Sequence, residues 1–239
     1  MKYRILSYVV LIGLLLFPVA AGAETADEWV ARGIEHYYAQ EYDEAIECFT
    51  AAIEIDPTNA IAHNGLGVSH KSLGRYDEAI SDFTRSIELD PEYAKPYYNR
   101  GDAYDLLERY DEAISDFTRV YEIDPDKAYG VNSRGWIYYE MGDYDRALED
   151  VTVALGLEPD DPSSLDTRAN IYRELGRYDE ALADINRAIE LMPDYSWAYY
   201  TRGLIYREMG EEEKARADMI KAYDMGEEEA YDALEDMGE

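Results

Sequence analysis

The apolar residues of this chain follow a pattern that returns every 34 positions from Ala26 onward. Within each period, two stretches of about a dozen residues carry apolar side chains at helical spacing, and a short break such as Leu73-Gly74-Arg75 separates them. The repeat is strongest in the sequence RYDEAISDFTR, which occurs unchanged at residues 75–85 and 109–119. Each period therefore predicts a helical hairpin.

Six such units fill residues 26–229 without gaps. Their boundaries are 26–59, 60–93, 94–127, 128–161, 162–195 and 196–229. A hairpin that is apolar on one face buries that face against its neighbours, so we expect the units to stack into one array. Residues 230–239 are rich in Asp and Glu, and we expect them to form an acidic capping helix over the open end of the stack.

Small residues recur at fixed places in the units. Position 8 is glycine in five units and alanine in the other, and position 20 is alanine in all six, so the two helices of a unit can approach closely. Proline at position 32 of the first five units ends the second helix.

These marks resemble the tetratricopeptide repeat motif, which asks for a large residue at position 4, Leu at 7, Gly at 8, Tyr at 11, Ala at 20, an aromatic at 24, Ala at 27 and Pro at 32. Unit 1 matches through Trp29, Gly33, Ala45, Phe49, Ala52 and Pro57, and unit 3 through Tyr97, Gly101, Tyr104, Ala113, Phe117 and Pro125. The resemblance covers about 204 of the 239 residues. It implies an all-α fold, a right-handed superhelical α-solenoid that mediates protein–protein interaction or complex assembly.

Two charged columns depart from the motif. Position 7 is arginine in five units, and position 23 is aspartate in five. We predict that each arginine pairs with the aspartate of the preceding unit, because Leu66 and Cys48 then meet at one apolar junction, whereas pairing within units leaves two mismatches. The expected semi-buried pairs, which would fix register more than add stability, are Arg100 with Asp82, Arg134 with Asp116, Arg168 with Asp150 and Arg202 with Asp184.

The N-terminus predicts export. Lys2 and Arg4 precede an apolar run over residues 5–17, and Ala21-Gly22-Ala23 has the form of a cleavage site. This is typical of a secretory signal peptide over residues 1–23, which places the mature chain in the periplasm or outside the cell. The alternative is an uncleaved membrane anchor, against which the run is short compared with the ~20 residues of a spanning helix.

Composition and motifs narrow the function. A formal net charge of −31 disfavours nucleic acid as a partner. The single Cys48 can form no internal disulfide, and the three histidines fall at packing positions of the repeat. The chain contains none of the common nucleotide-binding, hydrolase or metalloprotease motifs, and its acidic clusters lack the spacing of a calcium loop. We therefore expect no catalytic site, no metal and no cofactor.

The remaining candidate is the concave groove, which the resemblance assigns to positions 2, 5, 6, 9, 12 and 13 of each unit. Aromatic residues make up about 22% of these 36 positions against 13% of the chain, and four of the six asparagines lie there. Asparagine can bond the backbone of an extended peptide, and Tyr and Trp offer rigid contact area. The peptide-binding candidates are Asn64, Tyr98, Asn99, Tyr129, Asn132, Trp136, Tyr139, Asn170, Trp197 and Tyr200.

Two other interpretations stay open for these residues. The aromatics can complete the packing between units, and the asparagines can bond local backbone or one another. The groove positions hold four basic and seven acidic residues, a net of −3, so we expect the acidity of the chain to serve solubility and not the capture of a basic partner. The function predicted is an exported scaffold that binds a protein or peptide segment, and the alternative is a membrane-tethered assembly factor with an uncleaved N-terminal helix.

Overall fold

The computed structural model describes residues 24–238, and the expected signal peptide over residues 1–23 lies outside them. In the described part the chain is helical, without strands. Its helices are α1 (Ala26–Tyr38), α2 (Tyr42–Ile55), α3 (Ala60–Ser72), α4 (Tyr76–Leu89), α5 (Ala94–Asp105), α6 (Tyr110–Ile123), α7 (Ala128–Glu140), α8 (Tyr144–Leu157), α9 (Pro162–Glu174), α10 (Tyr178–Leu191), α11 (Ser196–Glu208), α12 (Glu212–Asp224) and α13 (Glu229–Asp236).

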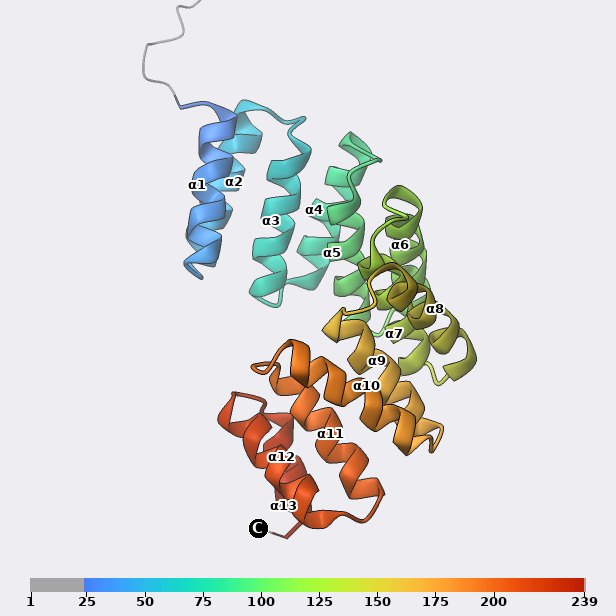
Figure 1. Ribbon diagram of the computed structural model, residues 1–239. Coiled ribbons are helices and arrows are strands. Elements are labelled where there is room, and N and C mark those ends of the chain that lie inside the picture. Colours follow the sequence, from blue (N-terminus) through green and yellow to red (C-terminus); the bar gives the residue numbers. More distant parts are fainter. Residues whose placement is uncertain (1–23, 239) are drawn as a thin grey trace, which may run out of the picture.

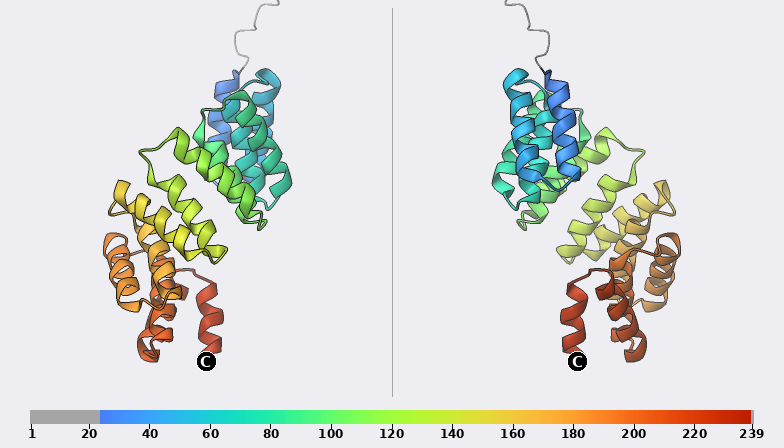
Figure 2. Two further views of the ribbon diagram at one scale, coloured as in Figure 1. Left: turned by 90° about the vertical axis from the view of Figure 1, so that its right-hand side faces the viewer. Right: turned by 90° about the vertical axis from the view of Figure 1, so that its left-hand side faces the viewer.

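The helices form six consecutive antiparallel pairs that stack in chain order (Figure 1). The first helix of each pair begins at one of the six unit starts read from the sequence. Successive pairs are rotated with respect to one another, so that the stack curves from α1 at one end to α13 at the other (Figure 2). The predicted all-α solenoid is thereby confirmed.

The core of each unit is one large side chain pressed against a small one. Position 24 holds a side chain that is at most 2% exposed in every unit. Across the pair lies the position-8 glycine; a Cβ built on Gly101 would stand 2.9 Å from Cε1 of Phe117. Such a distance is shorter than ordinary carbon contact, so glycine is what lets the ring cover the first helix. The position-24 residues are Phe49, Phe83, Phe117, Val151, Ile185 and Met219.

The arginine and aspartate columns do form ion pairs, but the predicted partners are wrong. Four of the five arginines bind the aspartate of their own unit in a bidentate manner, with Nε–Oδ2 distances of 2.6–2.7 Å. The pairs are Arg100 with Asp116, Arg134 with Asp150, Arg168 with Asp184 and Arg202 with Asp218. The reason is the hairpin itself: positions 7 and 23 are equally far from position 15 in the turn, and such positions face each other across antiparallel helices.

The link to the preceding unit is made by neutral side chains. Nη1 of Arg100 donates to Oγ1 of Thr84 at 2.8 Å, and Nη1 of Arg134 donates to Oγ1 of Thr118 at 3.0 Å. Arg202 reaches Asn186 in the same manner. These three acceptors all occupy position 25 of the unit before, so one guanidinium joins both helices of its own pair to the preceding pair.

The two mismatches are accommodated locally. Arg32, which faces Cys48, pairs with Glu24 instead. Asp82, which faces Leu66, bonds Nδ1 of His70 at 2.8 Å. Because Arg32 and Asp82 each have another charged or polar partner, the apolar residues Leu66 and Cys48 do not indicate which units pair with each other.

The last helix closes the stack. Ala230, Ala233 and Leu234 of α13 are buried and pack with Met219 and Ala222 of α12. Its remaining residues include four carboxylates that keep the outer face polar. Among the described residues, no helix has the length and apolar character needed to cross a membrane.

A double-mutant cycle distinguishes the two pairings. We expect Arg134→Leu and Asp150→Leu to couple by about 1.5 to 3 kcal/mol in the free energy of unfolding, because each removal leaves a buried charge unpaired. Arg134→Leu and Asp116→Leu, the pairing read from the sequence, should couple by less than ~0.5 kcal/mol. Urea denaturation of the single and double variants measures both, and the reverse order would contradict the observed geometry.

Candidate peptide-binding groove

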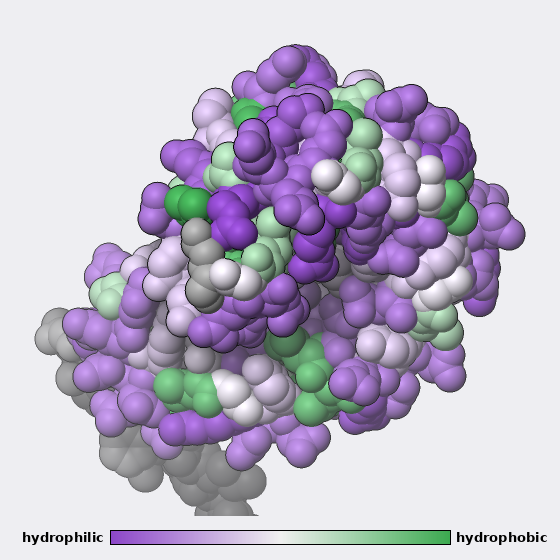
Figure 3. Space-filling view, turned by 90° about the horizontal axis from the view of Figure 1, so that it is seen from below, coloured by the Kyte–Doolittle hydropathy of each residue, from purple (hydrophilic) through white to green (hydrophobic). Residues whose placement is uncertain are grey.

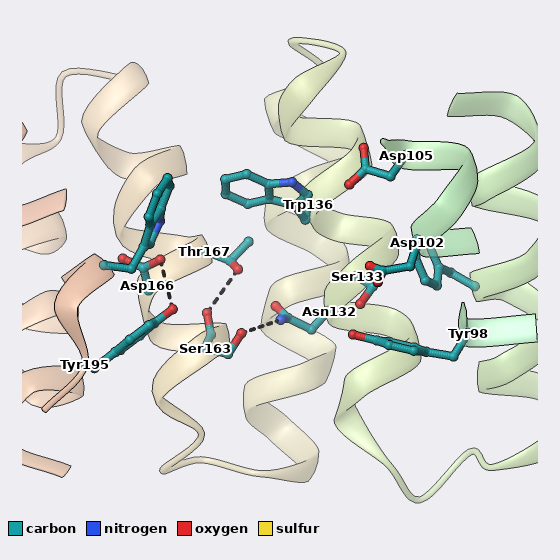
Figure 4. A pocket seen from close by; sticks show the side chains of 12 residues that line it. Tyr98, Asp102, Asp105, Asn132, Ser133, Trp136, Ser163, Asp166, Thr167 and Tyr195 are labelled. Carbon is teal, nitrogen blue, oxygen red and sulfur yellow. Dashed lines mark hydrogen bonds between the residues drawn. The ribbon is translucent and has the colours of Figure 1, made fainter. Parts of the chain in front are cut away.

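A pocket of about 360 Å³ opens between α5, α7, α9 and the start of α11. It spans the first helices of four consecutive units, and α7 forms its middle, with α5 and α9 on either side (Figure 4). Seen from below, the molecule is mostly hydrophilic, and some of its apolar patches lie beside a central hollow (Figure 3). The pocket is lined by Tyr98, Asp102, Asp105, Phe117, Asn132, Ser133, Trp136, Ser163, Asp166, Thr167, Tyr195 and Trp197.

Four of the ten groove candidates line this pocket: Tyr98, Asn132, Trp136 and Trp197. They come from α5, α7 and α11, so residues up to 99 positions apart in the chain share one cavity. The stacking of the pairs brings them together, because the same helix face is presented in each unit. Asn64 lines a second pocket of about 220 Å³ between α1, α3 and the start of α5.

Each of the three aromatic candidates in the lining packs against a tyrosine that was also a candidate. Ring centroids are 5.5 Å apart for Tyr98 and Tyr129, 5.1 Å for Trp136 and Tyr139, and 5.3 Å for Trp197 and Tyr200. Such contacts restrict the rotamers of the lining rings. The packing interpretation therefore describes Tyr129, Tyr139 and Tyr200, which hold the pocket aromatics in place.

The hydroxyl groups of two supporting tyrosines, Tyr129 and Tyr139, have partners inside the protein. Tyr129 donates to Asp124 Oδ2 at 3.0 Å, and burial together with that carboxylate raises the pKa of Tyr129 to about 12. Tyr139 accepts from Nη2 of Arg173 at 3.1 Å, and burial raises the pKa of Tyr139 to about 12. Tyr200 packs beside the cluster under α13.

Three of the four asparagines bond within the protein. Asn99 donates to Oδ1 of Asn64 at 3.0 Å, and Asn170 donates to the carbonyl of Asp166 and to Oγ1 of Thr201. The interpretation in which they bond one another or local backbone is thus the one observed for them.

Asn132 differs from the others. Its Nδ2 makes a long bond of 3.4 Å to Oγ of Ser163, and its Oδ1 is buried with no hydrogen-bond partner. A buried acceptor of this kind is uncommon in native proteins. Asn132 is the asparagine whose side chain lines the pocket with an unused acceptor.

Three carboxylates line the pocket, and their role was missed in the sequence. Asp102 and Asp105 lie on the α5 side and Asp166 on the α9 side, with no basic side chain in the lining (Figure 4). The expectation that groove acidity serves solubility rested on a net count over 36 positions, which hides this local grouping. Asp102 also pairs with Lys71 of α3.

Two of these carboxylates are hard to ionise. Asp166 is 3% exposed; its Oδ2 accepts from the Tyr195 hydroxyl at 3.4 Å, and its Oδ1 has no hydrogen-bond partner. Burial raises the pKa of Asp166 to about 7. Burial, with the nearby charges of Asp102 and Glu140, raises the pKa of Asp105 to about 6.

Tyr195 was missed because it lies at position 34, outside the six groove offsets. Tyrosine occurs at position 34 only in units 2 and 5, as Tyr93 and Tyr195. Each lines one of the two pockets in the groove. This pattern was present in the sequence and could have identified both positions.

No reactive group stands out in the described residues. Cys48 is buried, and burial raises the pKa of its thiol, which disfavours the nucleophilic thiolate. His36 and His70 pair with Glu41 and Asp82. Across the part of the chain that the structure covers, no three Asp, Glu, His or Cys side chains are grouped closely enough to hold a metal ion.

The fold and groove define a helical-repeat scaffold. Sequence models described as tetratricopeptide repeat match residues 30–94, 69–128, 131–161 and 198–225, and one described as TPR repeat matches residues 169–210. The chain belongs to the tetratricopeptide repeat family. Proteins of this family are typically non-enzymatic and bind protein partners.

Solved structures agree on the fold. The chain is similar to one in the APC/C hetero-tetramer Cut9-Hcn1, with a TM-score of 0.78 and 22% identity over 90% of this chain and 43% of that one, so it spans less than half of that relative. A tetratricopeptide repeat protein from Parabacteroides merdae gives a TM-score of 0.69 and 22% identity over 84% and 79% of the two chains.

A third structure is YrrB, described as a TPR protein with an unusual peptide-binding site, with a TM-score of 0.54 and 25% identity over 80% of this chain and 99% of that one. No curated protein matches the chain.

The raised pKa of Asp166 makes a stability prediction. Because the native state holds this proton more tightly than the unfolded chain, Asp166 lowers stability as pH rises from about 4 to about 7. Asp166→Asn cannot ionise, so its advantage over the natural chain should grow by on the order of 2 to 3 kcal/mol between pH 5 and pH 8.

Urea denaturation at both pH values measures the difference. Asp145→Asn, an equal charge change on the exposed surface of α8, is the control and should show no such growth. An advantage of Asp166→Asn that is constant with pH would mean that Asp166 ionises normally.

Proposed function

We propose that this protein is an exported scaffold that binds an extended segment of another protein along the groove from Asn64 to Tyr200. The observation that carries the proposal is the pocket itself. Its lining comes mostly from the first helices of four units, and it presents three aromatic rings that each pack against a second ring and a residue with a buried, unpaired acceptor. Rigid aromatics beside unsatisfied polar atoms are what a recognition site offers to a ligand.

Similar proteins support this class of function. YrrB is described as having a peptide-binding site, and the Cut9-Hcn1 structure is of an assembly of more than one protein. Export is proposed from the sequence over residues 1–23. The partner would then be another exported or envelope protein, and nucleic acid is disfavoured by the charge of −31.

Site-specific cross-linking tests the groove. A photo-reactive amino acid at position 136, expressed in the native host, should give a discrete cross-link to one protein, because Trp136 lies in the pocket lining. Trp197→Ala, which removes another aromatic ring from the same pocket lining, should lower the yield about tenfold, the loss expected for a contact residue worth more than ~1 kcal/mol.

The matched control places the same group at position 231, where Tyr231 is an exposed aromatic on α13, 47% exposed and outside the pocket. Helicity measured by circular dichroism should be unchanged in all variants. Equal cross-linking from positions 136 and 231, or a yield indifferent to Trp197→Ala, would reject the groove as the binding site.

The state of the N-terminus decides between the exported scaffold and the membrane-tethered alternative. Cleavage after Ala21-Gly22-Ala23 predicts a mature chain that starts at Glu24. Intact-mass spectrometry of the protein purified from its native host measures this directly. A chain that keeps residues 1–23 and sediments with membranes would support the tethered assembly factor instead.

A further inference from the structure

Two residues that line the pocket each have a buried oxygen atom without a hydrogen-bond partner. The atoms are Oδ1 of Asp166 on α9 and Oδ1 of Asn132 on α7, and the two residues are 3% and 8% exposed. Most buried polar atoms in native proteins are paired, so an unpaired one calls for a missing partner. The Asn132 atom is an amide oxygen and the Asp166 atom, when the carboxyl group is ionised, is a carboxylate oxygen, so both are acceptors. The partner that completes this pocket must therefore be a hydrogen-bond donor.

The charges around the pocket favour a cationic donor. The lining holds Asp102 and Asp105 on one side and Asp166 on the other, and no basic residue (Figure 4). The neighbouring basic side chains leave Asp105 and Asp166 without an ion pair: Lys71 pairs with Asp102, and Arg173 pairs with Glu208 and Glu174 and donates to the Tyr139 hydroxyl. The unpaired acceptors thus lie in a site that carries excess negative charge.

The aromatic lining suits the same kind of ligand. Trp136, Trp197 and Tyr98 present ring surfaces to the pocket, and indole is the best side-chain partner for an organic cation. A bare metal ion fits poorly, because the carboxylates stand on opposite sides of the cavity and do not converge (Figure 4). The volume of about 360 Å³ is at the small end of ligand sites, which run from about 300 to 1,000 Å³.

We propose that this pocket binds a basic side chain, arginine in preference to lysine, of the segment that lies in the groove. The inference rests on the proposed function and specifies what the segment must contain. Arginine carries five N–H donors and no acceptor on a planar group that can stack on indole, whereas lysine carries three donors on a compact ammonium. The planar group carries donors on several edges, so it can donate to more than one acceptor while lying against a ring.

Binding of such a side chain is coupled to pH. Asp166 faces the hydroxyls of Tyr195 and Thr201 from the α11 side and the charge of Arg173 from its own helix, and Asp105 faces Asp102 and Glu140. Burial raises the pKa of both carboxyl groups, so each is partly protonated near neutral pH. A cation favours the ionised forms, so affinity should rise as pH rises through about 6 to 7.

The three tryptophans provide the readout. With 5-fluorotryptophan incorporated, ¹⁹F NMR gives one resonance each for Trp29, Trp136 and Trp197. The probe is N-acetyl-arginine amide. We expect the resonances of Trp136 and Trp197 to shift in a saturable manner, while Trp29, far away in the first unit, stays in place and reports any general binding of cations to this acidic surface.

Three comparisons test whether the pocket recognises the charge and shape of arginine through Asp166. N-acetyl-citrulline amide, neutral and of the same shape, should bind about tenfold more weakly, and N-acetyl-lysine amide should fall between the two. Lowering the pH from 8 to 5 should weaken arginine binding about tenfold, since few of the Asp166 carboxyls are ionised at pH 5. Asp166→Asn should remove most of the binding at pH 8, and Asp105→Asn should weaken it, whereas Asp145→Asn should leave it unchanged.

Citrulline binding as tight as arginine binding, or an Asp166→Asn variant that binds like the natural chain, would overturn the inference. The proposed function is judged separately. A cross-link from position 136 to a segment without arginine or lysine, together with no shift of Trp136 or Trp197 by the probe, would support the scaffold function. It would reject the proposal that the pocket binds a basic side chain. Saturable arginine binding without any cross-linked partner would support the pocket's preference and count against the scaffold function.

Discussion

The contact between the small residue at position 8 and the large one at position 24 fixes the geometry on which everything else depends. Gly101 allows the Phe117 ring to lie directly on α5, and the same contact recurs where Gly33 and Gly67 meet Phe49 and Phe83. Pairs held this closely present the same face of their first helix in each unit. The groove is therefore a consequence of core packing: side chains at positions 2, 5, 6 and 9 are placed side by side because positions 8 and 24 leave no other arrangement.

Much of this fold could be predicted from periodicity. The partners of the arginines and aspartates could not be predicted by counting the units in which one member of the pair is missing. Arg134 binds Asp150 and not Asp116, because the two helices of a unit fold back at position 15 and bring positions 7 and 23 opposite each other. That symmetry was available in the sequence. What could not be foreseen is how His70 and Glu24 replace the missing partners of Asp82 and Arg32, since such substitutions depend on side chains that merely happen to be near.

The site was predictable to a similar depth. Repeat offsets identified the helix face and so found Tyr98, Asn132, Trp136 and Trp197, yet they could not separate a lining ring from the tyrosine that supports it. The sequence also does not tell which of the four asparagines has a side-chain oxygen without a donor. That depends on how the side chain is placed, which for Asn132 leaves Nδ2 3.4 Å from Oγ of Ser163 and Oδ1 without a partner. The carboxylates were visible as residues, but their raised pKa values arise from burial, which exists only after the units stack.

Asp166 lowers the stability of the folded protein. Desolvation opposes its charge, its Oδ1 lacks a donor, and the adjacent Tyr195 supplies only a long bond to Oδ2. An apolar or amide side chain of similar size would pack there without that penalty, as Asn170 does one turn further along α9, with two hydrogen bonds. In the ion pair within unit 3, by contrast, both carboxylate oxygens of the buried Asp116 accept hydrogen bonds from Arg100. An aspartate left short of donors in the lining of a cavity is consistent with a donor that arrives with the ligand, so that ionisation and binding stabilise each other.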